Sequence, residues 1–199
     1  MENLVTELVC TRLSHDIVGN IGAVSNAVEL LEEGDMDFMD DIKSILKISA
    51  KTLASRLKFF RMAFGLNNAN LEDEAVVKQT AQDYLSTIGN KDFPVQLTFN
   101  VSTPDLRKSA LLMVMIMADV LIRGGNLDII EKQNKLVSRI ELSSRYSREK
   151  LEKIHKVLSD SKAPIDAGMA PLFALIERED RSHLSLSADE QFITLTAEH

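Results

Sequence analysis

Apolar residues recur at intervals of three and four along the first part of the chain. The first stripe consists of Leu13, Ile17, Ile21, Val24, Val28 and Leu31. This spacing predicts one amphipathic helix from near Asn3 to Glu33, because residues three and four apart share one face of an α-helix. Gly34 would follow the end of this helix, and Asp35 or Asp37 could cap the next one.

A second stripe at helical spacing follows after a few residues. It consists of Ile42, Leu46, Ser49, Leu53, Leu57, Phe60 and Phe64. Two long helices joined by so short a connection must run antiparallel as a helical hairpin. Further apolar residues lie outside this stripe, namely Ile45, Ile48, Phe59 and Met62. A lone hairpin cannot bury this surface, so a second copy is expected to complete a dimeric four-helix bundle. The alternative is that the rest of the same chain covers it.

The pattern changes after residue 66. Residues 65–70 are polar and turn-prone, which predicts a boundary between a domain of residues 1–66 and a domain of residues 67–199. The second domain alternates helical and period-two patterns. Helices are predicted over Glu72–Ile88, Asp105–Ile122, Ser147–Leu158 and Asp166–Glu179, and strands over Val95–Val101, Asn126–Glu131, Leu136–Ser143, Leu184–Ser187 and Gln191–Thr196. This order favours an α/β sandwich with helices on one sheet face, and an α+β fold for the whole chain.

Composition limits the classes of function. The formal net charge of −7 weighs against a nucleic-acid or anionic-membrane surface, which needs clustered Lys and Arg. The longest apolar run, Ala110–Ala118, is about half of the roughly 20 residues that cross a bilayer, so a soluble chain is expected. Cys10 is the only cysteine of the sequence, and the cytoplasm is therefore the expected location.

The first predicted helix combines a histidine with two glycines. At about 100° per residue, one line runs down the helix roughly opposite the apolar stripe, through Leu8, Arg12, His15, Gly19, Gly22 and Asn26. Each interior glycine costs about 1 kcal/mol relative to alanine, so two of them invite a reason. The missing side chains would let another molecule approach the imidazole. The alternative is close packing of the helix against the neighbouring domain.

His15 offers a nucleophile on this face. A neutral imidazole attacks electrophiles readily, and histidine is commonly neutral near physiological pH. Asp16 can orient or polarise the ring. Arg12, one turn back, could screen the negative charge of a phosphoryl group carried on the histidine. The alternative is an ordinary surface histidine.

The segment around His15 resembles a known family. LVCTRLSHDIVGNIGAVSNAVELLEEG is similar to the His-Asp segment of bacterial histidine phosphotransferases of the ChpT type, which in turn resemble the dimerisation and phosphoacceptor hairpin of sensor histidine kinases. The matching residues are His15-Asp16-Ile17-Val18, Gly22-Ala23, Asn26 and Glu29-Leu30-Leu31. The resemblance implies that His15 accepts and donates phosphoryl groups beside an acidic Asp16. One departure is Asn20, where such segments commonly have proline and a helix kink.

A weaker resemblance continues into the second domain. ADVLIRGGNLDI is similar to the helix, double glycine and strand of the kinase ATP-binding fold. ATP binding in that fold would need a magnesium-binding Asn near Ala118 or Asp119, and an Asp-x-Gly-x-Gly turn after the strand ending near Ser143. The sequence has neither. The resemblance therefore implies a degenerate ATPase-like domain that binds no ATP. Independently of the resemblance, Gly124 and Gly125 are expected to end a helix, because glycine commonly follows the last helical residue.

Other candidate sites have little support in the sequence. The remaining histidines lack the paired Cys or His-Glu-x-x-His spacing of a metal site; they are His155, His183 and His199. The methionines of one apolar helix are expected to fill the core; they are Met113, Met115 and Met117.

The resemblance implies a phosphorelay histidine phosphotransferase that passes a phosphoryl group between receiver-domain aspartates through His15. Its implied partners are receiver domains of response regulators and a hybrid sensor kinase. The chain itself is expected to need no cofactor, because receivers bring their own Mg²⁺. Docking is expected to involve Arg12, Gly19, Gly22 and Asn26. The main alternative is a non-catalytic dimeric adaptor that binds receiver or kinase domains; an ATP-dependent autokinase is disfavoured by the missing nucleotide residues.

Overall fold

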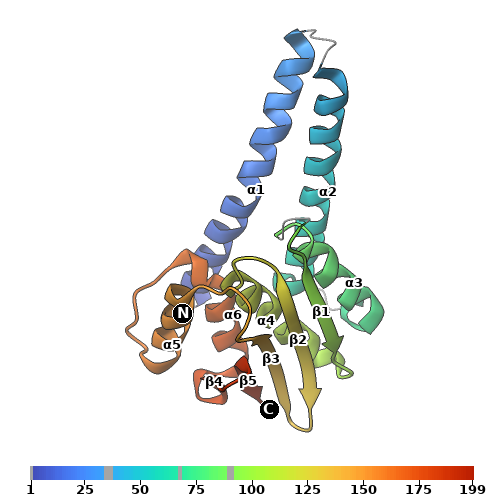
Figure 1. Cartoon of the computed structure of the whole chain (residues 1–199). Helices are drawn as coiled ribbons and strands as arrows, with labels where there is room; N and C mark the ends of the chain where they lie inside the picture. Colours follow the sequence, from blue (N-terminus) through green and yellow to red (C-terminus); the bar gives the residue numbers. More distant parts are fainter. Residues whose placement is uncertain (1, 34–37, 67–68, 89–91) are drawn as a thin grey trace.

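The computed structural model describes residues 2–33, 38–66, 69–88 and 92–199. A long antiparallel hairpin projects from a mixed α/β part (Figure 1), and its helices are α1 (Glu2–Glu33) and α2 (Met39–Phe64). The predicted limits of the first helix are confirmed, and α1 is an uninterrupted α-helix through Asn20. The expected helix end and cap at Gly34, Asp35 and Asp37 lie outside the described residues.

The predicted apolar stripe of α1 is only partly used within one chain. Leu13 and Ile17 pack against the core at the base of the hairpin. Higher up, the contact with α2 buries the small side chain of Ala27, while Ile21 and Val28 stay exposed. One chain therefore leaves much of the upper stripe uncovered.

The lower half of α2 enters the main core. Phe59 is fully buried and stacks on Tyr84, with ring centroids 3.9 Å apart, because the helix that carries Tyr84 packs against α2. Met62 is buried as well. The same chain thus covers Phe59 and Met62, and their assignment to a surface awaiting a second copy is wrong. Ile45 and Ile48 remain exposed.

A five-stranded mixed sheet forms the second part, with strand order β1-β2-β3-β5-β4. The strands are β1 (Val95–Asn100), β2 (Gly125–Lys132), β3 (Lys135–Glu141), β4 (Leu184–Ala188) and β5 (Phe192–Glu198). β1 and β2 pair in parallel and all other neighbours are antiparallel. Val95 and Phe99 are buried between exposed Gln96 and Thr98, as the period-two pattern of this segment predicts.

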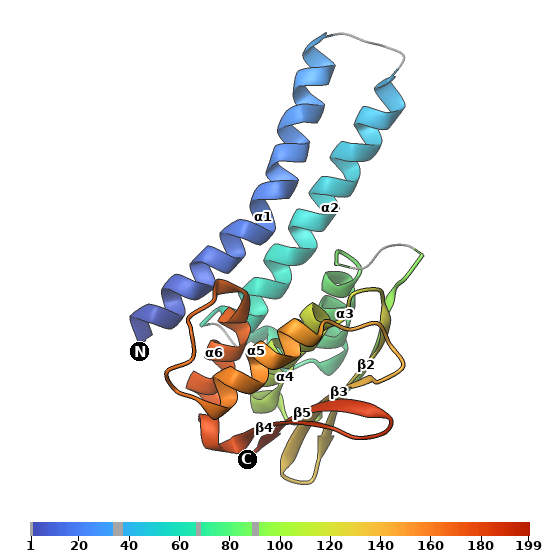
Figure 2. The same ribbon diagram turned by 60° about the vertical axis from the view of Figure 1, so that its left-hand side comes forward.

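Helices cover one face of this sheet (Figure 2), and the α+β class is confirmed. They are α3 (Glu74–Leu85), α4 (Arg107–Val120), α5 (Arg148–Ser159) and α6 (Ala170–Glu179), with short 3₁₀ turns η2 (Ala69–Leu71), η3 (Pro104–Leu106), η4 (Ala167–Met169) and η5 (Arg181–His183). α4 contacts the sheet, α2 and α6, so it is central to the core. Its methionines Met113, Met115 and Met117 are fully buried, as predicted.

Gly124 and Gly125 have a different role from the predicted one. α4 ends at Val120, before the glycines, so their assignment as the helix terminator is wrong. Their φ angles are +56° and +129°, and a Cβ at Gly124 would lie 2.6 Å from the carbonyl oxygen of Phe93. The glycines therefore allow the close approach of two chain segments where β2 begins.

Candidate functional site

His15 lies on the outer surface of α1, and its side chain is 85% exposed. Gly19 and Gly22 follow on the same line toward the hairpin tip, and Asn26 beyond them is exposed. A Cβ added at either glycine would meet no atom within 4 Å. Close packing against the rest of the chain therefore does not explain the glycines, which leave open surface beside the imidazole.

The lower end of the same line is not open. Leu8 is buried and Arg12 is half-buried, because this end of α1 packs against α6 and η4. The predicted line thus divides at His15. The structure groups His15 with Gly19, Gly22 and Asn26 on one open surface, and directs Arg12 into the interface with the α/β part.

Asp16 lies beside the imidazole, but its carboxylate is only 14% exposed. Its Oδ1 is 3.4 Å from Nδ1 of His15, a distance that fits weak orientation of the ring. A proton on Nδ1 facing this carboxylate leaves the lone pair on Nε2, the nitrogen that can then act as a nucleophile. The orienting role of Asp16 stays a prediction, and this distance allows it.

Arg12 binds two carboxylates at once. Its Nε donates to Oδ2 of Asp16 at 2.8 Å, and its two terminal nitrogens donate to both oxygens of Asp119 of α4 at 2.7 and 2.9 Å. Burial opposes the guanidinium charge, but hydrogen bonds and charges from Asp119 and Asp16 offset this and raise the pKa of Arg12. Arg12 is therefore engaged within the chain, whereas the sequence suggested that it could face a phosphoryl group.

Arg56 of α2 supports the turn that bears the histidine. It donates to the backbone oxygen of Asp16, and to the side-chain and backbone oxygens of Thr87 at 3.2 and 3.3 Å. Arg56 thereby joins both hairpin helices to the chain just after α3. Sequence reasoning missed Arg56 and Asp119, because each meets this site from another helix and no local spacing signals such contacts.

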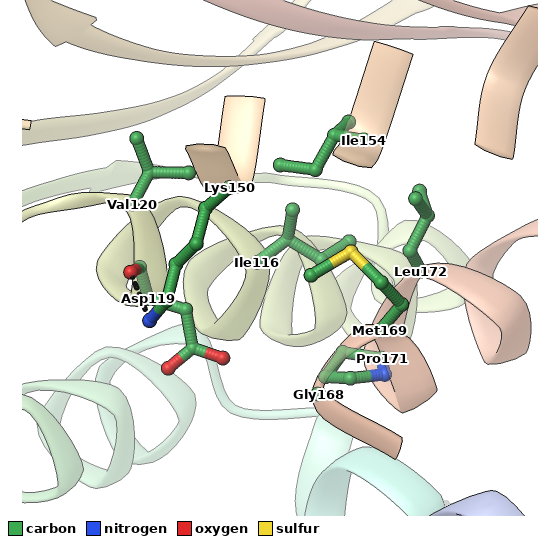
Figure 3. A pocket seen from close by; sticks show the side chains of 9 residues that line it. All are labelled: Ile116, Asp119, Val120, Lys150, Ile154, Gly168, Met169, Pro171 and Leu172. Carbon is green, nitrogen blue, oxygen red and sulfur yellow. Dashed lines mark hydrogen bonds between the residues drawn. The ribbon is translucent and has the colours of Figure 1, made fainter. Parts of the chain in front are cut away.

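A small apolar cavity lies beside Asp119, between α4, α5 and the start of α6 (Figure 3). Lys150 stands at its edge and donates to the backbone oxygen of Asp119 at 2.6 Å. The apolar side chains that converge on it include Ile116, Ile154, Met169 and Leu172. Its volume of about 10 Å³ suits roughly one water molecule, whereas small-molecule sites typically measure about 300–1,000 Å³.

A second, open groove lies on another side of the hairpin base. Its volume is about 590 Å³, and it is lined by Leu13, Ala54, Leu57, Lys58, Phe60, Arg61, Phe64 and Gly65. Leu13 lies about 160° around α1 from His15, so the groove and the histidine occupy different faces. Leu57 is 52% exposed in the single chain.

Two sequence expectations about other features can be compared with the described part of the chain. No group of three or more His, Cys, Asp or Glu side chains there is placed to hold a metal ion. His155 and His183 are exposed and far apart in the sequence, and His199 pairs with Glu179 at 3.0 Å. None of the helices described combines the length and hydrophobicity of a membrane span.

Known proteins resemble the chain over nearly its whole length. It is 29% identical to the protein phosphotransferase ChpT of Brucella abortus (strain 2308), over 96% of this chain and 93% of that protein. A solved bacterial phosphotransferase superposes with a TM-score of 0.75 at 28% identity, covering 98% of this chain and 95% of its own. No protein-family model matches. The resemblance to ChpT-type proteins predicted around His15 is confirmed.

Proposed function

We propose that this ChpT-like chain is a phosphorelay histidine phosphotransferase, in which His15 carries a phosphoryl group between the aspartates of two receiver domains. The observation that carries the proposal is the open imidazole of His15, with Nδ1 facing Asp16 and a surface without side chains beside it. Similarity to phosphotransferases in both sequence and structure supports group transfer.

The transfer is a substitution at phosphorus. Nε2 of neutral His15 attacks the phosphorus of an aspartyl phosphate; the new N–P bond forms while the bond to the aspartate oxygen breaks, and the carboxylate leaves with its electron pair. The proton on Nδ1 stays on the ring. The carboxylate of Asp16 stabilises the positive charge that develops on the imidazole. A carboxylate of the second receiver then attacks the phosphorus and releases neutral His15.

We define the docking surface as His15, Gly19, Gly22 and Asn26 of α1 together with Val18, Ile45 and Ile48. Val18 and Ile48 are 62% and 55% exposed. Ile45 lies roughly three helical turns before Arg56, on the side of α2 whose Arg56 reaches Asp16. Exposed apolar side chains on both helices thus lie near the glycines, as is common in surfaces that bind another protein. Arg12 is not part of it.

The proposed step needs no cofactor bound to this chain, because the receiver would bring its own Mg²⁺. We also propose that the α/β part does not use ATP. The sequence lacks the magnesium-binding Asn and the Asp-x-Gly-x-Gly turn, and the cavity beside Asp119 is small and lined mainly by apolar side chains. The expected cytoplasmic location and a hybrid sensor kinase as phosphoryl source belong to the same proposal.

A homodimer is the second component of the proposal. Leu13 and Leu57 line the open groove at the hairpin base. The exposed Ile21 and Val28 lie on a neighbouring face of the hairpin. A second hairpin, related by two-fold symmetry, would cover these side chains and complete a four-helix bundle. The docking surface lies on a different face and would stay open in this dimer.

His15→Ala separates the phosphotransferase from the adaptor. Each variant is incubated with a receiver domain phosphorylated on its aspartate, and transferred phosphate that is labile to acid is measured. We expect His15→Ala to lose acceptance completely while binding of the receiver survives, because the nucleophile is removed and the other residues of the docking surface remain. His155→Ala, which changes an exposed histidine of α5, is the matched control and should accept normally. Acceptance by His15→Ala would refute the assignment, and binding without acceptance by the unmodified chain would favour the adaptor.

A further inference from the structure

A chain of polar contacts leads from the α/β part to the imidazole. Asp119 binds the two terminal nitrogens of Arg12, Arg12 binds Oδ2 of Asp16 through Nε, and Oδ1 of Asp16 faces Nδ1 of His15. Side chains in the middle of this chain are largely shielded from water, with 15% of Arg12, 14% of Asp16 and 12% of Asp119 exposed. Shielding strengthens such charged contacts relative to those on an open surface.

We infer that Asp119 is a positioning residue for His15, which acts through Arg12 to hold the Asp16 carboxylate in the orientation that keeps the imidazole proton on Nδ1. The inference rests on the proposed phosphotransfer, for which it names a further residue. It gives the α/β part a role in the transfer step that needs no nucleotide.

The geometry of the guanidinium explains why Asp119 matters. A guanidinium is planar, so two hydrogen bonds from its terminal nitrogens to Asp119 fix the plane and thereby the direction of the Nε–H bond. That bond holds Oδ2 of Asp16 and leaves Oδ1 toward His15. Without the Asp119 charge, Arg12 is free to turn and bind both oxygens of Asp16, since the two residues lie one helical turn apart. Oδ1 would then be taken from the imidazole.

Asp119 is well suited to hold Arg12 in place. It lies in the last turn of α4, the helix at the centre of the core. Lys150 of α5 donates to its backbone oxygen at 2.6 Å, and Arg12 makes a further bond to the backbone oxygen of Gly168 at 3.3 Å. The anchor of the contact chain is thus fixed by the α/β part, while its other end lies on the exposed face of α1.

The test is Asp119→Asn in the full chain, with two measurements. Nitrogen NMR of the His15 ring reports whether the neutral imidazole carries its proton on Nδ1 or Nε2. The rate of phosphoryl acceptance is measured against the concentration of phosphorylated receiver. We expect the Nδ1–H form to decrease and the maximal rate to fall about tenfold, the lower end of the loss seen when the residue that orients a metal-binding histidine is removed. The receiver concentration at half the maximal rate should stay unchanged, because Asp119 lies off the docking surface.

Two further variants make the test specific. Asp128→Asn breaks a comparable pair with Arg139, at 2.8 Å on the sheet, and should change neither measurement. Arg12→Gln combined with Asp119→Asn should lose no more than Arg12→Gln alone, because Asp119 acts through Arg12. Asp119→Glu, which keeps the charge, should restore part of the rate. If Asp119→Asn fails to fold, Arg12→Lys gives the same ring measurement, since lysine cannot bind both carboxylates with a fixed fork.

The outcomes separate this inference from the proposed function. If folded Asp119→Asn keeps the His15 proton on Nδ1 and the same maximal rate of phosphoryl acceptance, the positioning role is refuted while the proposed phosphotransfer stands. A tenfold lower maximal rate with the His15 proton still on Nδ1 would mean that the ion pair only fastens α1 to the α/β part. This result would also overturn the positioning role of Asp119. Failure of the unmodified chain to accept phosphate would refute the proposed function, and the ring measurement would still decide whether Asp119 positions His15.

Discussion

Replacing the glycines of the docking surface should separate stability from function. Gly19 and Gly22 lie inside α1 with φ angles that other residues adopt, and a Cβ at either position meets no atom within 4 Å. Alanine therefore fits both sites without strain. Glycine loses more backbone freedom on folding than alanine does, so each Gly→Ala change should stabilise the chain.

The expected gain follows from these open positions. Each alanine should add about 0.5–1 kcal/mol to the free energy of unfolding. The two effects should add to about 1–2 kcal/mol, because each gain comes from the backbone freedom of its own residue and not from a contact between side chains. For a chain of this size, 1 kcal/mol raises Tm by about 2–4 °C, so the double alanine variant should melt about 2–8 °C higher. Leucine has a similar helix propensity and should preserve most of the gain.

The same positions should respond oppositely in receiver binding. A leucine at position 22 fills the surface that a receiver must approach, and a misfit side chain in a packed interface costs about 1–3 kcal/mol. Gly22→Leu should therefore weaken receiver binding about tenfold, since 1.4 kcal/mol corresponds to that factor. Gly22→Ala, with its smaller side chain, serves as the matched control. Thermal unfolding followed by circular dichroism and titration calorimetry with the receiver measure the two effects.

Two results would refute this reasoning. A lower Tm for the alanine variants would show that α1 is not open at the glycines. Unchanged receiver affinity in a folded Gly22→Leu variant would show that the receiver does not dock over them.

Two further predictions concern the bundle and the α/β part. Leu57→Glu should convert a dimer to a folded monomer, because Leu57 is exposed in the single chain. The matched control Ile165→Glu, at another exposed position, should leave the dimer intact. Light scattering measures the oligomeric state, and an unmodified chain that is monomeric at high micromolar concentration would contradict the prediction. Calorimetric titration with ATP and Mg²⁺ should give no saturable binding in the millimolar range, since the sequence has neither the magnesium-binding Asn nor the Asp-x-Gly-x-Gly turn, and Mg²⁺-dependent saturation would contradict this prediction.

Local patterns were sufficient to predict most elements. Helical spacing gave the limits of α1, and period-two alternation gave β1 with Val95 and Phe99 buried. Both signals depend on neighbours within a few residues. The open line of His15, Gly19 and Gly22 was predicted for the same reason, since it needs only the geometry of one helix.

Contacts between distant segments were beyond such patterns. Phe59 resembles any apolar residue on a long helix, and only the placement of Tyr84 shows that the same chain buries it. Arg12 was predicted on a face that the histidine shares, but its partner Asp119 lies 107 residues away. Gly124 was assigned to the end of a helix from its position after an apolar helical run. Its actual role, a positive φ close to the backbone of Phe93, depends on a neighbouring segment that no local pattern reveals.

The uncovered upper hairpin has a consequence for how stiffness is distributed along α1. Below His15, α1 packs against the α/β part. Above His15, α1 packs along α2 of the same chain, and Ile21 and Val28 are exposed. In a single chain, amide hydrogen exchange should therefore quicken from the base of the hairpin toward its tip. A second copy that covers this region would slow exchange there. It would also order the hairpin before a receiver docks, so that docking would lose less conformational entropy and dimer assembly and docking would favour each other.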